Sequence, residues 1–418
     1  MNRLKQTRRR GSAYVFVLGA ATLIATAGVL ATVLQRQRLM RQQDATDTLK
    51  VEQAHASAIE YGYSLFAADP SGNAWRPFRK LVINAPTLLG DNNATHTITL
   101  TDPVDDDLRT ANLTDTVRMT VETVVGSARR KSQANFAFTV KPVDGLAHAL
   151  IRDSINGGGT VTVTGTTGTS SLRPTRPATY NANAQIGVTP AAFREAVEAV
   201  NGAATMTVPE PAENLFTYYS SIGTLINVTG DTKYDGVLFS PTSNPAGTGV
   251  NAKGVYVINA NGKKVDFEDT RVFGTLVIIN AHAQSAIGSR VSMSPAASDM
   301  PTLLVDGSID FGMEMNDLTE SGAGRNLNPT GAPYLGATDS DTSDQYPSRI
   351  RGLVYVSGNA QISGSSVFEG VLWIRGKLTV NGNRTLTARW APLTEPIAGF
   401  TQATGIYVAP ESVARVAP

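Results

Sequence analysis

The sequence contains no cysteine and only four histidines in 418 residues. The absence of cysteine excludes disulfide bonds, thiolate zinc sites, iron–sulfur clusters and a cysteine nucleophile. The chain also lacks a phosphate-binding loop, a nucleophile elbow, an HExxH zinc motif and a dinucleotide fingerprint. Most familiar enzyme classes are therefore not expected, and we predict a protein without enzymatic activity.

Neither sign of charge is in excess, with 36 lysines and arginines against 35 aspartates and glutamates. Five of the cations lie in residues 1–11 together with no acid, so the rest of the chain carries a net charge of −4. A protein that binds nucleic acid through a broad basic surface is not expected. The length allows two or three domains.

Charge is missing altogether from Ser12 to Leu34, a run of 23 residues. A helix of about 20 apolar residues spans a bilayer. More cations precede the run than follow it, which favours a cytoplasmic N-terminus and a C-terminal domain outside the membrane. A secretory signal peptide cut after Ala25-Thr26-Ala27 is the competing interpretation, but apolar residues continue beyond that site.

The residues after the apolar run predict that the helix continues. From Gln35 to Ala68 there is no proline. Apolar residues recur there at helical spacing, namely Ala45, Leu49, Ala56, Ile59, Tyr63 and Phe66. We therefore expect one transmembrane and amphipathic helix over residues 12–68, whose second part packs on a soluble domain.

The basic leader MNRLKQTRRRG, residues 1–11, followed by this helix resembles the class III leader of type IV pilin-like proteins, a family that includes minor pilins and pseudopilins. The resemblance implies that a prepilin peptidase cuts after Gly11 and that Ser12 becomes the methylated first residue. The fifth mature residue of that family is usually glutamate, which neutralises a neighbour's amine in the apolar filament core. Here it is Phe16, which indicates a minor or tip subunit rather than a repeating shaft subunit.

The middle of the chain is predicted to hold a small β-rich, pilin-like head over residues 69–150. Strand-like segments lie at residues 97–101, 116–125 and 133–141, and the linker 126–132 makes the last two a hairpin. Residues 151–215 are expected to connect the head to the next domain. This connection contains one short helix at residues 190–201, signalled by a proline at its start and a glycine after its end.

A repeat of 18 residues marks the C-terminal half. It is clearest between the segments that begin at Gly352 and Gly370. The further matched pairs at this offset are Gly358 with Gly376, Ile362 with Val380, Gly364 with Gly382, and Phe368 with Leu386. GVLFS at Gly236 and GVYVI at Gly254 repeat the offset, and GTLVI at Gly274 follows after 20 residues.

Short strands repeated in this way cannot bury their apolar faces singly, but stacked coils can. The fold class is thus mainly β, with one long N-terminal helix and an antiparallel β head. For residues 216–390 we predict a right-handed parallel β-helix or solenoid, with a β-sandwich of hairpins as the alternative. Residues 391–418, which contain four prolines, are predicted to be a C-terminal cap or tail.

Two clusters of charged residues are candidate sites. Asp339, Asp341 and Asp344 lie in a polar interruption of the repeat, where carboxylates at this spacing suit a calcium ion or form a solvated acidic loop. No other cofactor is expected. Parallel β-helices often carry carbohydrate-degrading enzymes, and the best candidate face for such an activity comprises Lys263, Lys264, Asp266, Glu268, Asp269 and Arg271. An ordinary half-buried strand explains the same alternation.

We therefore predict a structural subunit of a type IV pilus-like or secretion pseudopilus-like assembly. It would cross the cytoplasmic membrane once, and it would become extracellular after filament assembly. Its expected partners are other pilin-like subunits along the helix, the prepilin peptidase and a surface polysaccharide, with a role in adhesion or secretion. The alternative is a bitopic or secreted envelope β-helix protein that binds or modifies carbohydrate.

Overall fold

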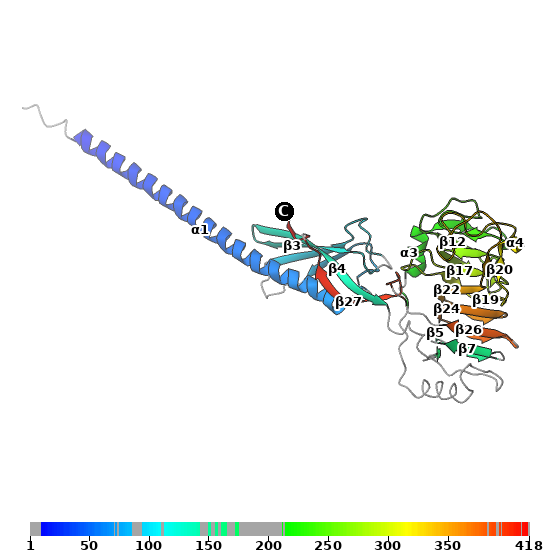
Figure 1. Ribbon diagram of the computed structural model, residues 1–418. Helices are drawn as coiled ribbons and strands as arrows, with labels where there is room; N and C mark the ends of the chain where they lie inside the picture. The colour runs from blue at the N-terminus through cyan, green and yellow to red at the C-terminus, as the bar shows by residue number, and fades with distance from the viewer. Residues whose placement is uncertain are drawn as a thin grey trace, which may run out of the picture. The chain divides into compact units, whose positions relative to one another are not determined.

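The computed structural model describes residues 10–70, 72, 75–85, 94–109, 113–142, 149–151, 155–157, 160–164, 172–174, 211, 214–382, 384–389, 393, 395–410 and 412–416. The chain forms two compact units (Figure 1). The first contains residues 1–108, 116–137 and 406–418, and the second contains residues 109–115 and 138–405. Leader residues 1–9 and the predicted helix at 190–201 lie outside the described residues.

One helix, α1 (Arg10–Ala68), runs without interruption for 59 residues. It confirms the prediction of a single long helix at the start of the chain. Its second half packs on a sheet of the first unit through a row of buried side chains that includes Val51, Ala58 and Phe66. Phe66 in turn meets the rings of Trp75 and Phe136. Apolar residues at helical spacing are therefore buried in a core only in the second half of α1.

The sheet of the first unit is antiparallel among its first four strands. These are β1 (Leu81–Ala85), β2 (Ala94–Thr101), β3 (Val117–Val125) and β4 (Ala128–Pro142), paired in that order. Buried residues alternate with partly buried or exposed ones along β2 and β3, so one face of the sheet covers a core.

The predicted hairpin forms from β3 and β4, but the predicted linker over residues 126–132 is wrong. Val125 pairs with Ala128 across a two-residue turn, in which Gly126 has a φ of 56°. Glycine adopts this left-handed backbone easily. The basic residues after the turn belong to β4, where Arg129 forms an ion pair with Glu122 and Arg130 forms one with Glu52.

The predicted C-terminal cap or tail is also different in the structure. Strands β27 (Thr401–Val408) and β28 (Ala414–Arg415) both pair with β4 and extend the antiparallel sheet. The Ala409 amide donates to the Asn135 carbonyl, and the Val416 amide donates to the Lys131 carbonyl. The edge of β4 offers unpaired backbone groups, and these strands satisfy them. The proline content of residues 391–418 does not reveal that this segment pairs with β4.

A small polar network lies buried between α1 and this sheet. Nδ1 of His55 lies 3.1 Å from Oγ1 of Thr123, and Nε2 lies 2.7 Å from Oγ of Ser132. Nδ1 of His96 lies 3.2 Å from the same Thr123 oxygen. Burial, followed by the nearby charges of His96 and Arg415, lowers the pKa of His55, and burial lowers the pKa of His96.

We expect the first unit to lose stability as the pH falls from about 7.5 to 5.5, because both rings are favoured in the neutral form. The unfolded histidines bind protons near their ordinary pKa of about 6.5, whereas the folded ones bind them only at lower pH. Stability is therefore complete only above the pH range in which the unfolded histidines bind protons, and it declines progressively as the pH falls through that range toward the lowered pKa values of the folded protein. Urea unfolding monitored at Trp75 measures this. His55→Gln should flatten the decline while the exposed control His282→Gln should not, and a wild-type stability that rises on acidification would contradict the expectation.

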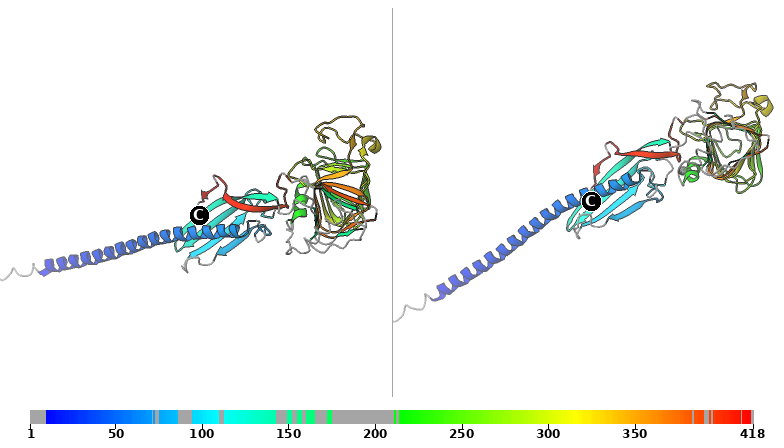
Figure 2. Two further views of the ribbon diagram at one scale, coloured as in Figure 1. Left: turned by 60° about the horizontal axis from the view of Figure 1, so that its bottom comes forward. Right: turned by 90° about the horizontal axis from the view of Figure 1, so that it is seen from below.

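The second unit is built mainly from parallel strands, and the chain passes repeatedly between two sheets. One sheet contains β11, β14, β17, β22, β18, β15, β12 and β9 as a path, with β24, β26, β5, β7 and β8 joined to it. The other contains β10, β13, β16, β19, β23, β25 and β6. The right view of Figure 2 shows these strands surrounding one interior, which is filled by apolar side chains such as Phe267, Leu276 and Phe311.

The bounds of these strands follow the chain. The larger sheet contains β9 (Thr224–Asn227), β11 (Leu238–Phe239), β12 (Val255–Asn259), β14 (Arg271–Phe273), β15 (Thr275–Ala281), β17 (Ser292–Ser294), β18 (Leu303–Gly307), β22 (Arg349–Val356), β24 (Ser365–Ile374) and β26 (Thr385–Arg389). The smaller sheet contains β10 (Thr232–Asp235), β13 (Val265–Glu268), β16 (Ala286–Ile287), β19 (Ile309–Phe311), β23 (Ala360–Ile362) and β25 (Leu378–Val380). The pairs that the described residues make within these two sheets are parallel, unlike the hairpins of the alternative sandwich.

The 18-residue offset corresponds to the strand register between β22 and β24 and between β23 and β25. Gly352 pairs with Gly370, and Ile362 pairs with Val380. The match of Phe368 with Leu386 is wrong by two residues, because Phe368 pairs with Ala388. The shift of two residues keeps the same side chains on the inward face, because side chains alternate between faces with a period of two.

Nearer the start of the unit the predicted repeat holds only in part. Val255 pairs with Thr275, which keeps the expected offset of 20. The proposed match of Gly236 with Gly254 is wrong, because β11 pairs with β14 and β12 pairs with β9. Leu238 thereby stacks on Arg271, because a loop after β11 makes this coil longer than 18 residues.

Part of the predicted connecting region also belongs to the stack. Strands β5 (Ala149–Ile151), β6 (Ile155–Gly157) and β7 (Thr160–Thr164) pair in parallel with β24, β25 and β26. Strand β8 (Leu172–Pro174) pairs with β5. The boundary predicted at residue 150 therefore divides one coil, because backbone pairing with distant strands leaves no local sign in the sequence.

Helix α3 (Leu215–Ile222) covers the outer face of the larger sheet. Leu215 and Tyr219 pack there with Tyr355, Trp373 and Phe400, and the Tyr219 hydroxyl donates to the Ala398 carbonyl at 3.1 Å. Both faces of these strands are thus buried, which explains their continuous apolar runs.

Candidate functional site

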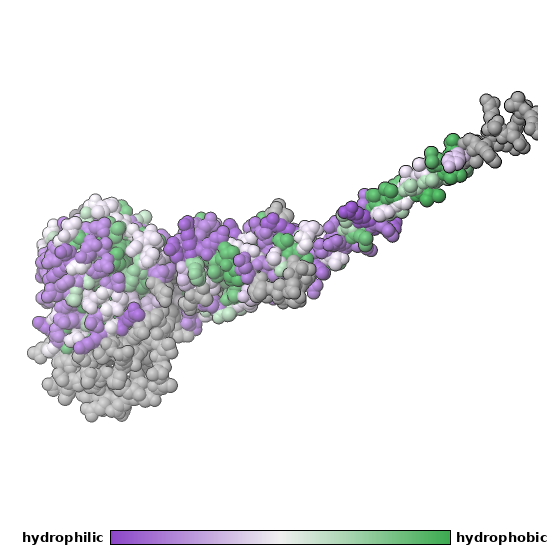
Figure 3. Space-filling model, turned by 180° about the vertical axis from the view of Figure 1, so that it is seen from behind, coloured by the Kyte–Doolittle hydropathy of each residue, from purple (hydrophilic) through white to green (hydrophobic). Residues whose placement is uncertain are grey.

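The first half of α1 exposes an apolar surface. The described residues from Tyr14 to Asp44 are all exposed, and Figure 3 shows hydrophobic side chains along this arm of the helix. Phe16 is 81% exposed. The helix has the length and hydropathy of a membrane span, and none of its most apolar stretch is buried against the rest of the protein.

Polar groups within this apolar stretch are satisfied by the helix itself. The hydroxyls of Thr22, Thr26 and Thr32 donate to carbonyls four residues earlier, at 2.9, 2.8 and 2.7 Å. Such bonds matter in lipid, where no water is available to an unpaired group. Among the residues that the structure describes, a Cβ at Gly19 or Gly28 would meet nothing within 4 Å, so no described contact requires either glycine.

The predicted processing residues lie at the start of this helix. Gly11 and Ser12 are both within α1. Ala25-Thr26-Ala27, the competing signal-peptidase site, lies in the middle of the same helix. Cleavage at either place remains a prediction, as does the role assigned to Phe16.

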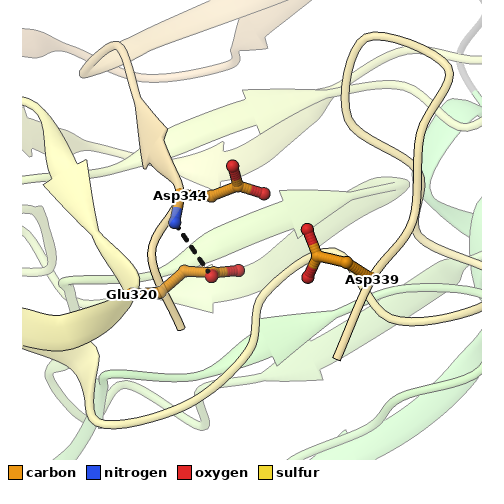
Figure 4. Close-up of side chains that lie close together, drawn as sticks. All are labelled: Glu320, Asp339 and Asp344. Carbon is orange, nitrogen blue, oxygen red and sulfur yellow. Dashed lines mark hydrogen bonds between the residues drawn. The ribbon is translucent and has the colours of Figure 1, made fainter. Parts of the chain in front are cut away.

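The structure brings together two of the three predicted calcium ligands and adds a third that the sequence did not suggest. Carboxylate oxygens of Glu320, Asp339 and Asp344 lie within 4.8 Å of one another (Figure 4). Asp341 is exposed and instead accepts hydrogen bonds from the amide and hydroxyl of Ser343, which lower its pKa. We name Glu320, Asp339 and Asp344 the acidic cluster.

Glu320 is fully buried at the start of the short helix α4 (Glu320–Ala323). Its Oε1 accepts from the Leu327 amide at 2.6 Å and from the Tyr346 hydroxyl at 2.7 Å. Its Oε2 accepts from the Asp344 amide at 3.2 Å. Tyr346 lies on β21 (Gln345–Tyr346), which pairs with β20 (Leu318–Thr319). The two strands therefore hold the segments carrying Glu320 and Asp344 side by side.

Burial and the negative charges of the acidic cluster raise the pKa of one of its members. Burial, followed by the carboxylates of Asp339 and Glu320, raises the pKa of Asp344. Burial and the hydrogen bond to Glu320 raise the pKa of Tyr346, so this tyrosine remains a donor. Three carboxylates held this close together are chemically suited to a cation.

Arg271 approaches the cluster from the parallel stack. Its guanidinium donates to the carbonyls of Leu327, Ala332 and Pro333 and lies 4.9 Å from the ring centre of Tyr346. Burial lowers the pKa of Arg271. The sequence placed this residue on an outward polar face, which is wrong, because the polar interruption folds back over the strand and buries the side chain.

The other charges of the predicted carbohydrate-degrading face form ion pairs at the surface. Lys264 pairs with Asp266, Glu268 with Lys233, and Asp269 with Arg290, at 2.6, 2.7 and 2.5 Å. Lys263 is exposed. An enzymatic role for this face gains no geometric support among the described residues.

A cavity of about 540 Å³ lies beside the polar interruption. Its lining combines the arginines Arg349 and Arg351 and the carboxylate of Glu369 with the side chains of Tyr334 and Leu335. Glu369 is engaged by Arg349 at 2.9 Å. The cavity offers both polar and aromatic surface to a ligand.

Comparison with known proteins gives little direct guidance. No family model matches the sequence, and no curated protein matches it. Among solved structures, the chain is similar to the competence-associated pilin ComZ from Thermus thermophilus, with 12% identity and a TM-score of 0.27. The similarity covers 89% of this chain and 98% of that one. A TM-score and an identity this low do not establish a common fold.

Proposed function

We propose that this chain is a membrane-anchored, non-enzymatic structural subunit of a type IV pilus-like or secretion pseudopilus-like assembly. The observation that supports it most is the division of α1 into an exposed first part, which carries no charge over residues 12–34, and a second part that packs on an antiparallel sheet. A simple anchor does not need a continuous helix of 59 residues. In the assembly, the apolar half packs beside the same helix of other pilin-like subunits.

Processing and topology follow from the same proposal. The prepilin peptidase cuts after Gly11, Ser12 is methylated, and the protein spans the cytoplasmic membrane with its C-terminal part outside. Phe16 in place of glutamate offers no carboxylate to a neighbour's amine, which suits a minor or tip subunit. The parallel stack is a right-handed β-solenoid that contacts a surface, a polysaccharide or a partner subunit.

Gly11→Ala is expected to abolish cleavage, because the peptidase must accommodate the residue before the cut bond. Intact mass and N-terminal sequencing of protein from the native envelope provide the readout. The wild type should begin at Ser12, and Gly11→Ala should retain the leader completely. Gly19→Ala is the matched control, since a Cβ there meets nothing within 4 Å, and it should be cut normally. A wild-type chain that begins at Met1 would refute the processing step.

The second candidate function is binding or modification of carbohydrate by a bitopic or secreted envelope protein. The cavity beside the polar interruption supports it, because its lining combines charged and aromatic groups. A native chain beginning at Met1 or Gly28 would favour this function over filament assembly. Binding of envelope polysaccharides that is lost in Arg351→Ala would then support the cavity as the binding site.

A further inference from the structure

The acidic cluster has more negative charge than its surroundings balance. Three carboxylates lie within 4.8 Å of one another. Among the described residues they form no ion pair. The positive charge of Arg271 acts on Glu320 and Asp344, but its guanidinium donates its hydrogen bonds to three carbonyls instead. Three negative groups and one positive group leave a net charge of −2. We propose that this cluster binds one calcium ion.

The side chain of Asn328 supports the site independently of the carboxylates. This residue is only 2% exposed. Its Nδ2 lies 3.3 Å from Oδ2 of Asp339 and 2.7 Å from Oδ2 of Asp344, so the amide is aimed into the cluster. Its Oδ1 is buried and has no hydrogen-bond partner among the residues that the structure describes. Native proteins rarely leave a buried acceptor unpaired.

An ion in the cluster would give that oxygen a partner. The oxygen and nitrogen of an asparagine amide have nearly the same shape, so a half-turn about the last side-chain bond exchanges their positions. The turn places Oδ1 where Nδ2 now contacts both aspartates, and it moves Nδ2 to the buried position of Oδ1, which no described donor contacts. Asn328 then supplies a fourth oxygen ligand, next to Glu320, Asp339 and Asp344.

The dimensions and ligand types favour calcium over other metals. Calcium binds six to eight oxygens at about 2.3–2.6 Å, so ligands on opposite sides of the ion lie up to about 5 Å apart. The carboxylate oxygens of the acidic cluster lie within 4.8 Å of one another, so they are close enough together to surround one such ion. Magnesium requires shorter bonds of about 2.0–2.1 Å in a strict octahedron, and zinc prefers nitrogen and sulfur. Water would complete the coordination beside Asp339, which is exposed.

Terbium luminescence provides a direct test on the full-length protein in detergent micelles. Terbium replaces calcium at oxygen sites, and Tyr346, whose hydroxyl contacts Glu320, can transfer excitation to it. We expect luminescence that saturates at one ion per chain and is displaced by calcium. Calcium should also raise the Tm of the second unit by about 5 °C at 100 times its Kd.

Asp339→Asn tests the ligand assignment without burying a new group, since Asp339 is exposed. It should weaken calcium binding at least tenfold, and Asn328→Ala should weaken it by a similar factor while Asn328→Asp retains binding. Asp341→Asn is the matched control, because Asp341 lies outside the cluster, and its affinity should stay within twofold of the wild type. The proposal is overturned if the wild type shows no binding at millimolar calcium, if Asp341→Asn weakens binding as much as Asp339→Asn, or if magnesium binds as tightly as calcium. Because these variants leave α1 unchanged, failure here would not bear on cleavage after Gly11.

Discussion

Gly370→Ala is expected to destabilise the second unit by about 3–5 kcal/mol, a large share of the stability of a typical domain. Gly370 has a φ of 137°, a backbone conformation that residues with a side chain rarely adopt. A Cβ there would lie 2.2 Å from the carbonyl oxygen of Gly352 on the adjacent coil. The backbones of Gly352 and Gly370 cannot move apart to make room for the Cβ, because β22 and β24 are paired on both sides of these residues. Urea unfolding followed at Trp373 would measure the loss.

Gly230→Ala is the control for this substitution. A Cβ at Gly230 meets nothing within 4 Å, and the residue is exposed. We expect its free energy of unfolding to stay within about 0.5 kcal/mol of the wild type. Equal effects of the two substitutions would show that the contact between Gly352 and Gly370 does not limit the spacing of the coils.

Arg271→Ala is expected to detach the polar interruption from the stack at a cost of about 3–5 kcal/mol. The substitution removes the donors to three carbonyls and leaves these buried groups unsatisfied. It also removes the cation that lies over the rings of Tyr334 and Tyr346. Hydrogen exchange should increase over residues 318–346 and remain slow in β12 and β15.

Arg389→Ala is the control for Arg271→Ala, because it also removes an arginine but from the surface of the protein. Arg389 contacts Glu369 at 3.1 Å with a side chain that is 60% exposed. Exposed ion pairs contribute little to stability, so hydrogen exchange over residues 318–346 should not change. Unchanged exchange in Arg271→Ala would mean that the interruption is held by its own strands, β20 and β21, rather than by the arginine.

The long helix and the last coils were predictable because their signals are local. An uncharged run followed by helical spacing determines α1, and the recurrence of glycine and apolar residues at a fixed offset determines the pairing of Gly352 with Gly370. The pattern fails where a coil changes length, as between Gly236 and Gly254. A turn of variable length keeps the apolar alternation of each strand but removes the constant offset on which the comparison depends.

The candidate metal site was predictable only in part, for a similar reason. Asp339 and Asp344 are close in sequence and lie together in the structure. Glu320 reaches them through the pairing of β20 with β21, and Arg271 reaches the same region through a loop that folds back over β14. Contacts of this kind depend on tertiary structure and leave no spacing that a single sequence reveals.

The return of β27 to β4 has a consequence for biosynthesis. Strand β4 ends at Pro142 and β27 begins at Thr401, so the ribosome makes the whole parallel stack between the two partners. At about 5–20 residues per second, this takes roughly 13–50 s. During that interval α1 is already available to the membrane while β4 has an open edge. An unpaired edge is a site for pairing with another chain, so a chaperone or a second subunit has its best access to β4 before synthesis is finished.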